Sequence, residues 1–146
     1  MPIPVATEAQ WQLTVVHGAL AHGWEVALRI EDAVYRILRA SDKADARRAL
    51  ALLHAWPDLV LVHPRRGKTL HVELKTDATK SQPTEAQQRR LALLYAGGND
   101  VRVWRPRHWD DEVAPTLAGA RQEARYAGID DVAALYDARC RNEGWC

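Results

Sequence analysis

The sequence contains no phenylalanine, one methionine, two cysteines and no long apolar run. A helix needs about 20 consecutive apolar residues to cross a bilayer, so no membrane-spanning segment is expected. The opening stretch MPIPVATEAQ lacks the basic and apolar parts of a secretory signal, so none is expected. Cys140 and Cys146 are too few for a disulfide framework. We therefore expect reduced thiols in a cytoplasmic protein, with one local disulfide as the alternative.

Charge of one sign is also scarce, since 20 Lys and Arg face 19 Asp and Glu and leave a net charge of +1. The chain as a whole therefore has no electrostatic preference for nucleic acid, and local clusters would have to supply any such contact. With 146 residues, 47% of them hydrophobic, the chain is long and apolar enough for one core. We predict a single domain over residues 1–146, with a core at about 7–111 and a helical extension at about 112–146.

The hydrophobic pattern predicts helices and strands in alternation. Thr7 and Thr84 are each followed three residues later by a glutamine, the pattern of a capping box, which predicts helices from Glu8 to His22 and from about 85 to Ala96. Four strands are predicted, at 24–30, 58–63, 69–76 and 100–105. This order indicates an α/β fold with a central mixed sheet of about four strands flanked by helices.

Two more helices are predicted between the first and second strands. One runs from Glu31 to Ala40. The other, from about Lys43 to Ala55, is capped by Ser41 or Asp42 and buries Leu50 and Leu53. Together they form a helical insertion at about 31–55.

Charged residues interrupt the second and third strands, in the stretch WPDLVLVHPRRGKTLHVELKT at positions 56–76. Two apolar runs joined by the turn RRGK predict a β-hairpin. Alternate side chains of a strand share a face, so His71, Glu73 and Lys75 lie together. Pairing across the hairpin brings Asp58 opposite Lys75 or Glu73. Two carboxylates and one ammonium therefore gather at one end of the hairpin.

Such a group suits metal-assisted chemistry. Buried charges without partners cost several kcal/mol each, roughly, and a divalent cation offsets the repulsion between carboxylates. Asp and Glu oxygens are suitable ligands for Mg²⁺ or Mn²⁺, which keep positions open for water and phosphate oxygens. Lys75 would orient or deprotonate water, or neutralise charge on a phosphorane, as phosphodiester hydrolysis requires. The alternative is that Glu73 and Lys75 only face solvent on a half-exposed strand.

The stretch PDLVLVHP…LHVELKT, followed by PTEAQQRRLALLYAGGNDVRVWRPRHWDD, resembles the virus-type replication-repair nuclease (VRR-NUC) domain. That domain belongs to the PD-(D/E)xK, or restriction-endonuclease-like, superfamily, and the resemblance covers Thr7 to about Asp111. It departs from the family at Ala55, where a glycine is usual, in the longer insertion and in the tail. The resemblance implies a restriction-endonuclease-like core and a metal-dependent deoxyribonuclease.

The resemblance also implies roles for individual residues. Asp58, Glu73 and the Leu74 carbonyl would bind Mg²⁺ or Mn²⁺, with Lys75 as the catalytic lysine. Glu8 would add a metal ligand from the first helix, or else serve only the helix dipole. Gln87 would reach the same site, or else only complete a capping box.

The implied partner is DNA, bound through phosphate contacts by basic residues that the sequence groups near the hairpin turn and the later elements: Arg65, Arg66, Lys68, Arg89 and Arg105. A solvated charged surface is the alternative for these residues. The resemblance further implies a homodimer acting on branched or structured DNA, like a Holliday-junction resolvase, in the cytoplasm of the cell or of a phage host. A sequence-specific homing or restriction-type endonuclease, or a non-catalytic DNA-binding or assembly protein with this fold, remains the alternative.

Overall fold

The structure, a computed structural model, describes residues 6–29, 32–120 and 128–146. Its four strands are β1 (Glu25–Arg29), β2 (Leu59–His63), β3 (Lys68–Leu74) and β4 (Asp100–Trp104). The α-helices are α1 (Glu8–Ala21), α2 (Asp32–Ala40), α3 (Ala44–Ala55), α4 (Glu85–Ala96), α5 (Ala114–Leu117) and α6 (Val132–Glu143). Short turns of other helix types are η1 (Pro106–His108), η2 (Trp109–Val113) and η3 (Gly128–Asp130).

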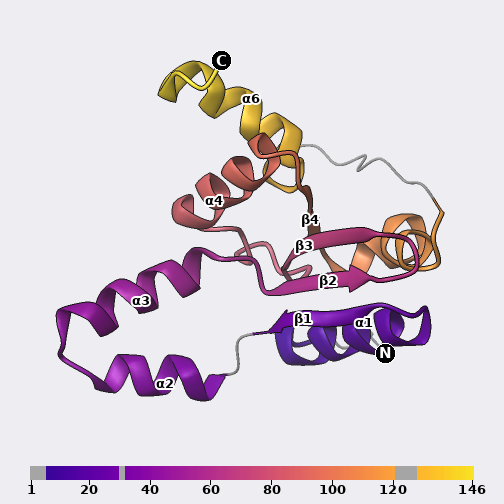
Figure 1. The fold of residues 1–146 in the computed structure, drawn as a ribbon, viewed down its shortest axis with the longest axis horizontal. Coiled ribbons are helices and arrows are strands. Elements are labelled where there is room, and N and C mark those ends of the chain that lie inside the picture. Colours follow the sequence, from indigo (N-terminus) through magenta and orange to yellow (C-terminus); the bar gives the residue numbers. More distant parts are fainter. Residues whose placement is uncertain (1–5, 30–31, 121–127) are drawn as a thin grey trace.

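The strands form one mixed sheet in the order β1-β2-β3-β4 (Figure 1). Strands β1, β2 and β3 pair antiparallel, and β4 runs parallel to β3 after a crossover through α4. The predicted mixed sheet of four strands flanked by helices is thus confirmed, as are the helical insertion and the helical C-terminal part. The β2–β3 hairpin forms as the sequence predicts, with Leu59 opposite Val72.

One face of the sheet is covered by α1 and α5, and the hydrophobic core lies between these two helices and the sheet. The core side chains from these helices and the sheet include Trp11, Val15, Ala19, Leu59, Leu61, Leu70, Val72, Leu74, Trp104 and Leu117. Two indole groups also fix the helices in place: Trp11 Nε1 donates to the Trp104 carbonyl (3.1 Å), and Trp24 Nε1 donates to the Leu117 carbonyl (2.9 Å). Residues beyond position 111 therefore contribute to the same core.

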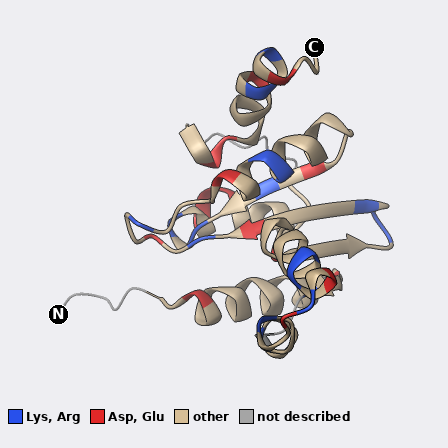
Figure 2. Cartoon of the chain, turned by 90° about the vertical axis from the view of Figure 1, so that its left-hand side faces the viewer, with Lys and Arg blue, Asp and Glu red and all other residues tan. Residues whose placement is uncertain are grey.

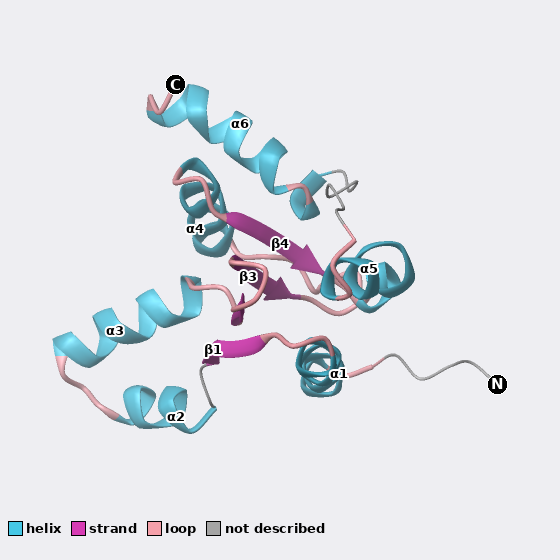
Figure 3. Cartoon of the chain, turned by 45° about the vertical axis from the view of Figure 1, so that its right-hand side comes forward, coloured by secondary structure: helices cyan, strands magenta, loops and turns pink. Residues whose placement is uncertain are grey.

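The other face is covered by α4 and α6, which pack against each other (Figure 3). Leu91 of α4 and Val132 of α6 meet Val101 and Val103 of β4 in a second, smaller cluster. Because side chains alternate along a strand, Glu73 shares this face with Val103, its neighbour in β4.

Helices α2 and α3 form an arm, defined as residues 32–55, that extends from one side of the sheet (Figures 1 and 3). The predicted cap at Ser41 or Asp42 is wrong: Lys43 occupies the N-cap of α3, with no side-chain hydrogen bond. Leu50 and Leu53 are only half-buried, because the arm packs on itself and on α4 rather than inside the core. The predicted strand and helix ends at residues 30 and 31 lie outside the described residues.

Both predicted capping boxes are present. The Thr7 side chain accepts from the Gln10 amide, and the Thr84 side chain accepts from the Gln87 amide, while each glutamine side chain accepts from the threonine amide. These bonds set the first residues of α1 and α4, which carry Glu8 and Gln87 toward the same end of the sheet.

The expectation of two reduced cysteines is wrong. Cys140 of α6 and Cys146 form a disulfide, the alternative that the sequence left open. A turn at Gly144, where φ is +74°, brings the two positions together, and glycine adopts this left-handed conformation without steric cost. Among the described residues, no helix is both long and apolar enough to span a membrane.

Candidate active site

The hairpin brings Asp58 and Glu73 together at the end of β2 and β3 that lies away from the turn. The pairing of Leu59 with Val72 continues by one step to Asp58 and Glu73. Asp58 Oδ2 accepts a hydrogen bond from the Leu74 amide (2.7 Å), which fixes this carboxylate beside β3. The predicted convergence is therefore confirmed, with Glu73 rather than Lys75 as the residue opposite Asp58.

Lys75 completes the cluster. Its Nζ lies 3.3 Å from Glu73 Oε1, and the Lys75 and Glu73 side chains are 13% and 2% exposed. Its amide donates to the Trp104 carbonyl (3.0 Å), which extends the β3–β4 pairing past the end of β3. An ammonium group is thus held on a buried carboxylate rather than in open solvent.

Burial raises the pKa of both carboxyl groups. Desolvation raises the pKa of Asp58 from 3.8 to about 6, although the hydrogen bond from Leu74 opposes the rise. Desolvation also raises the pKa of Glu73 well above its usual range, the negative charge of Asp58 raises it further, and Lys75 lowers it in part. One ammonium does not balance a buried and a half-buried carboxylate, so the cluster has the electrostatics of a cation site.

Glu8 lies at the same site although it comes from α1. It lines one cavity with Asp58 and Glu73, and its charge raises the pKa of both. The reason is local: Trp11, one turn later, bonds to the Trp104 carbonyl and so fixes this end of α1 over the end of β4. The predicted proximity of Glu8 is confirmed, while a ligand role stays a prediction.

Gln87 also lines this cavity, but both ends of its amide are already engaged. Its Oε1 accepts from the Thr84 amide (2.9 Å), and its Nε2 donates to the His54 carbonyl (3.2 Å). The capping interpretation is therefore confirmed. Gln87 additionally ties the start of α4 to the end of α3, and a direct catalytic role for it stays a prediction.

The cavity has a volume of about 430 Å³ and is partly walled by residues that sequence reasoning missed. These are Gln12 of α1, Tyr35 and Arg39 of α2, and His54 and Trp56 at the end of α3. Polar and aromatic residues on an amphipathic helix carry no sequence signal that separates a cavity wall from a solvent-facing surface. Only the packing of α1 and of the arm in the folded chain reveals them.

His71, predicted to share a strand face with Glu73 and Lys75, does not line the cavity. It is half-buried, but its Nδ1 has no hydrogen-bond partner among the described residues. Its ring contacts Trp56 edge-on at 6.2 Å between centroids, and burial lowers its pKa. It therefore packs against the cavity wall rather than binding within it.

Arg105 does not serve as the predicted DNA contact. It is 2% exposed, and its guanidinium donates to both carboxylate oxygens of Asp130 (2.7 and 3.0 Å). It also donates to the Thr76 and Ser81 carbonyls (2.6 and 2.7 Å). A guanidinium whose donors are occupied inside the protein cannot bind a phosphate, so Arg105 instead joins the loop after β3 to η3.

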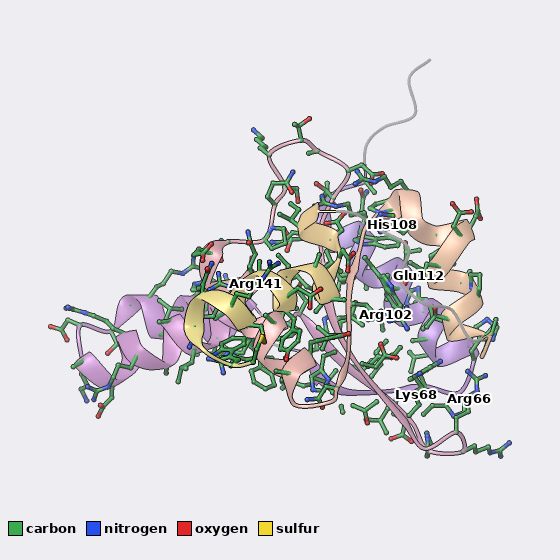
Figure 4. The ribbon with its side chains drawn as sticks, turned by 90° about the horizontal axis from the view of Figure 1, so that it is seen from above. Arg66, Lys68, Arg102, His108, Glu112 and Arg141 are labelled. Carbon is green, nitrogen blue, oxygen red and sulfur yellow. A yellow bond between two sulfur atoms is a disulfide. The ribbon has the colours of Figure 1, made fainter. Side chains whose placement is uncertain are left out.

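The basic residues of the hairpin turn lie far from the carboxylates. Arg66 and Lys68 lie at the hairpin turn (Figure 4), whereas Asp58 directly precedes β2 at the other end of the hairpin. Five strand residues separate the two ends, or about 17 Å at roughly 3.3 Å per residue. Arg66 donates to the Leu117 and Ala118 carbonyls (3.0 and 3.2 Å), and Lys68 pairs with Asp100 (2.9 Å). DNA contact by this turn therefore stays a prediction. Any such contact would lie remote from the carboxylates.

The other basic residues predicted to contact DNA differ in whether a carboxylate of the protein already pairs with them. Arg65 is exposed, and Arg89 is exposed but pairs with Glu143 of α6 (3.1 Å). Arg102 of β4 is buried and pairs with Glu112 (Figure 4) and with Asp100, at 2.6 Å from each. Arg102 therefore supports the fold.

The carboxylate oxygens at this site are ligands of the kind that Mg²⁺ or Mn²⁺ takes. Within the described residues, no group of three or more His, Cys, Asp or Glu side chains is arranged to hold a metal ion. Mg²⁺ usually takes only one or two carboxylates and keeps several waters, so a closed cage is not what it requires. The mutually repelling carboxylates of Asp58 and Glu73, with Glu8 lining the same cavity, are a ligand set of this limited kind.

Neither the known protein families nor the curated proteins yield a match for this chain. Comparison with solved structures finds a chain described as a "VRR_NUC domain protein". The two are 19% identical, with a TM-score of 0.48, over 88% of this chain and 99% of the other.

Proposed function

We propose that this protein is a nuclease that hydrolyses phosphodiester bonds of DNA with a divalent cation, Mg²⁺ or Mn²⁺. The observation that carries the proposal is the pair of half-buried Asp58 and buried Glu73, held by the hairpin beside the Lys75 ammonium and open to a cavity that Glu8 also lines. Burying two carboxylates against each other destabilises a fold unless something positive is bound there. A purely structural role for the hairpin would not account for two carboxylates placed together at a cost in stability.

Each residue then has a distinct task. Asp58 and Glu73, with the Leu74 carbonyl and with Glu8 across the cavity, would hold the cation. When bound, such an ion lowers the pKa of water and stabilises negative charge on phosphate oxygens. Lys75 Nζ, beside Glu73 Oε1, would hydrogen-bond the attacking water or a phosphate oxygen.

We further propose branched or structured DNA as the substrate and a homodimer as the active form. A junction offers two strands to cut, and a twofold dimer presents two equivalent sites. A sequence-specific endonuclease is the alternative, in which the arm and the C-terminal helices read the bases.

The direct test is incubation of the protein with single-stranded, linear duplex, flap and four-way-junction DNA, in Mg²⁺, Mn²⁺ or EDTA. We expect cleavage with either cation and none with EDTA, fastest on the flap or the junction. Binding without cleavage of any substrate in either cation would show a non-catalytic DNA-binding protein instead.

Glu8 and Gln87 can be separated by substitution. Glu8→Gln should reduce cleavage about tenfold or more, because it removes a charge that faces Asp58 and Glu73, with little change in melting temperature. Gln87→Ala should cost about 1 kcal/mol of stability, because it removes the capping box.

Gln87→Glu is the matched control, because a glutamate keeps the capping box but cannot donate to the His54 carbonyl. If Gln87→Glu cleaves like the unmodified protein, Gln87 acts only on the fold. Unchanged cleavage by Glu8→Gln would remove Glu8 from the site.

A further inference from the structure

The arm, residues 32–55, is built into the candidate active site rather than appended to it. Only Trp56 and Pro57 separate the end of α3 from Asp58, so the arm and the carboxylate site are joined by a short connection. Gln87 fixes the end of α3 from the other side through the His54 carbonyl. The position of the arm relative to the carboxylates is therefore defined at its base by two elements.

The arm lines the cavity with residues of a different kind from those that the sheet and α1 contribute. The sheet and α1 contribute carboxylates. The arm and the connection contribute basic and aromatic residues, which form the wall: Tyr35, Arg39, His54 and Trp56. The arm as a whole carries five basic residues, Arg36, Arg39, Lys43, Arg47 and Arg48, against three acidic ones, Asp32, Asp42 and Asp45. Figure 2, in which the arm points toward the viewer, shows Lys and Arg on both arm helices.

Arg39 is the cation of this wall. It is exposed, lines the cavity, and forms no ion pair with any carboxylate in the described part of the chain. It stands one helical turn after Tyr35, on the same face of α2. An arginine that pairs with no described carboxylate and lines a site for phosphate chemistry is placed to bind a backbone phosphate, through a charge-assisted and often bidentate pair.

Tyr35 and His54 form the aromatic part of the wall. Their rings are stacked, with centroids 4.6 Å apart and planes only 11° from parallel. Tyr35 is half-buried and its hydroxyl donates to the Leu53 carbonyl (3.5 Å), while His54 is exposed. A stacked ring pair that lines a cavity and has one exposed member can be extended by a further planar ring. Unpaired bases use aromatic side chains in this way.

We propose that the arm holds the nucleic-acid strand beside the bond to be cut, with Arg39 binding a backbone phosphate and the Tyr35–His54 stack holding an unpaired base. The inference rests on the proposed function and adds the kind of substrate: a strand with unpaired nucleotides next to the cleavage point. Fully paired duplex has no free base to offer to the stack. Discrimination between flap and duplex is thus assigned to the arm rather than to the metal site.

The test measures binding apart from cleavage. All variants are made in an Asp58→Asn background, and the affinity for fluorescent flap and duplex DNA is measured by anisotropy in EDTA. Arg39→Ala should weaken binding to both about tenfold and reduce the salt dependence by about one phosphate contact. Arg36→Ala is the matched control, an exposed arginine of the same helix outside the cavity, and should change affinity less than twofold, roughly. Arg39→Lys should restore most of the loss.

The stack is tested by Tyr35→Leu, which should weaken flap binding about fivefold or more and leave duplex binding nearly unchanged. Circular dichroism confirms that the arm stays helical in each variant. Equal affinities of Arg39→Ala and Arg36→Ala, or loss of flap and duplex binding together in Tyr35→Leu, would overturn the inference. Metal-dependent cleavage by the unmodified protein would leave the proposed function standing in that case. Failure of the unmodified protein to bind any DNA would overturn both.

Discussion

Asp58→Asn and Glu73→Gln are each expected to reduce metal-dependent cleavage by at least about a thousandfold. Each substitution removes one of the two negative charges that would hold a cation, and loss of about 4 kcal/mol of transition-state stabilisation corresponds to that factor. The geometry should survive. An asparagine oxygen can still accept the bond from the Leu74 amide that Asp58 Oδ2 now accepts at 2.7 Å.

The same variants are expected to be more stable than the unmodified protein when no cation is present. The folded-state pKa of Asp58 is about 6 against an ordinary 3.8. At a pH well above 6 the folded state therefore carries a penalty of up to about 3 kcal/mol for this charge. A neutral amide avoids the penalty, so we expect a gain of about 1–3 kcal/mol in EDTA.

Cleavage assays and thermal melts with and without Mg²⁺ check both parts of this prediction. Mg²⁺ should raise the melting temperature of the unmodified protein and not that of Asp58→Asn, because a ligand that binds only the folded state stabilises it. Asp110→Asn, an exposed carboxylate outside the cavity, is the control and should behave like the unmodified protein. Normal cleavage by both Asp58→Asn and Glu73→Gln would remove the proposed site.

Lys75→Ala is expected to lose about a hundredfold to ten-thousandfold in turnover while it still binds the cation. The lysine acts on water or on phosphate charge, and general acid–base or electrostatic contributions have about this size. Its loss should destabilise the metal-free protein, because Glu73 is 1% exposed and keeps no other positive partner in the described residues. Mg²⁺ should therefore raise the melting temperature of Lys75→Ala more than that of the unmodified protein.

Single-turnover cleavage and titration calorimetry with Mg²⁺ separate the two effects. Lys80→Ala, in the exposed loop after β3, is the matched control and should change neither measurement. Loss of cation affinity together with turnover in Lys75→Ala would assign Lys75 a structural task, namely holding Glu73 in place.

The sequence by itself determined the elements whose signals are local. Strand alternation and a short basic turn were enough to place Asp58, Glu73 and Lys75 together, because a two-strand hairpin leaves few choices of register. Capping boxes at Thr7 and Thr84 fixed where α1 and α4 begin.

Only the tertiary structure decided which charged residues face the site and which support the fold. Arg39 and Arg105 look alike in the sequence, yet one lines the cavity and the other is enclosed by Asp130 and loop carbonyls. The difference arises because the carboxylate partner of Arg105 lies 25 positions away in the chain, so only folding brings it near. The wall that Tyr35 and His54 form likewise depends on how two helices pack. Helical periodicity shows that such a helix has a polar face but not what that face meets.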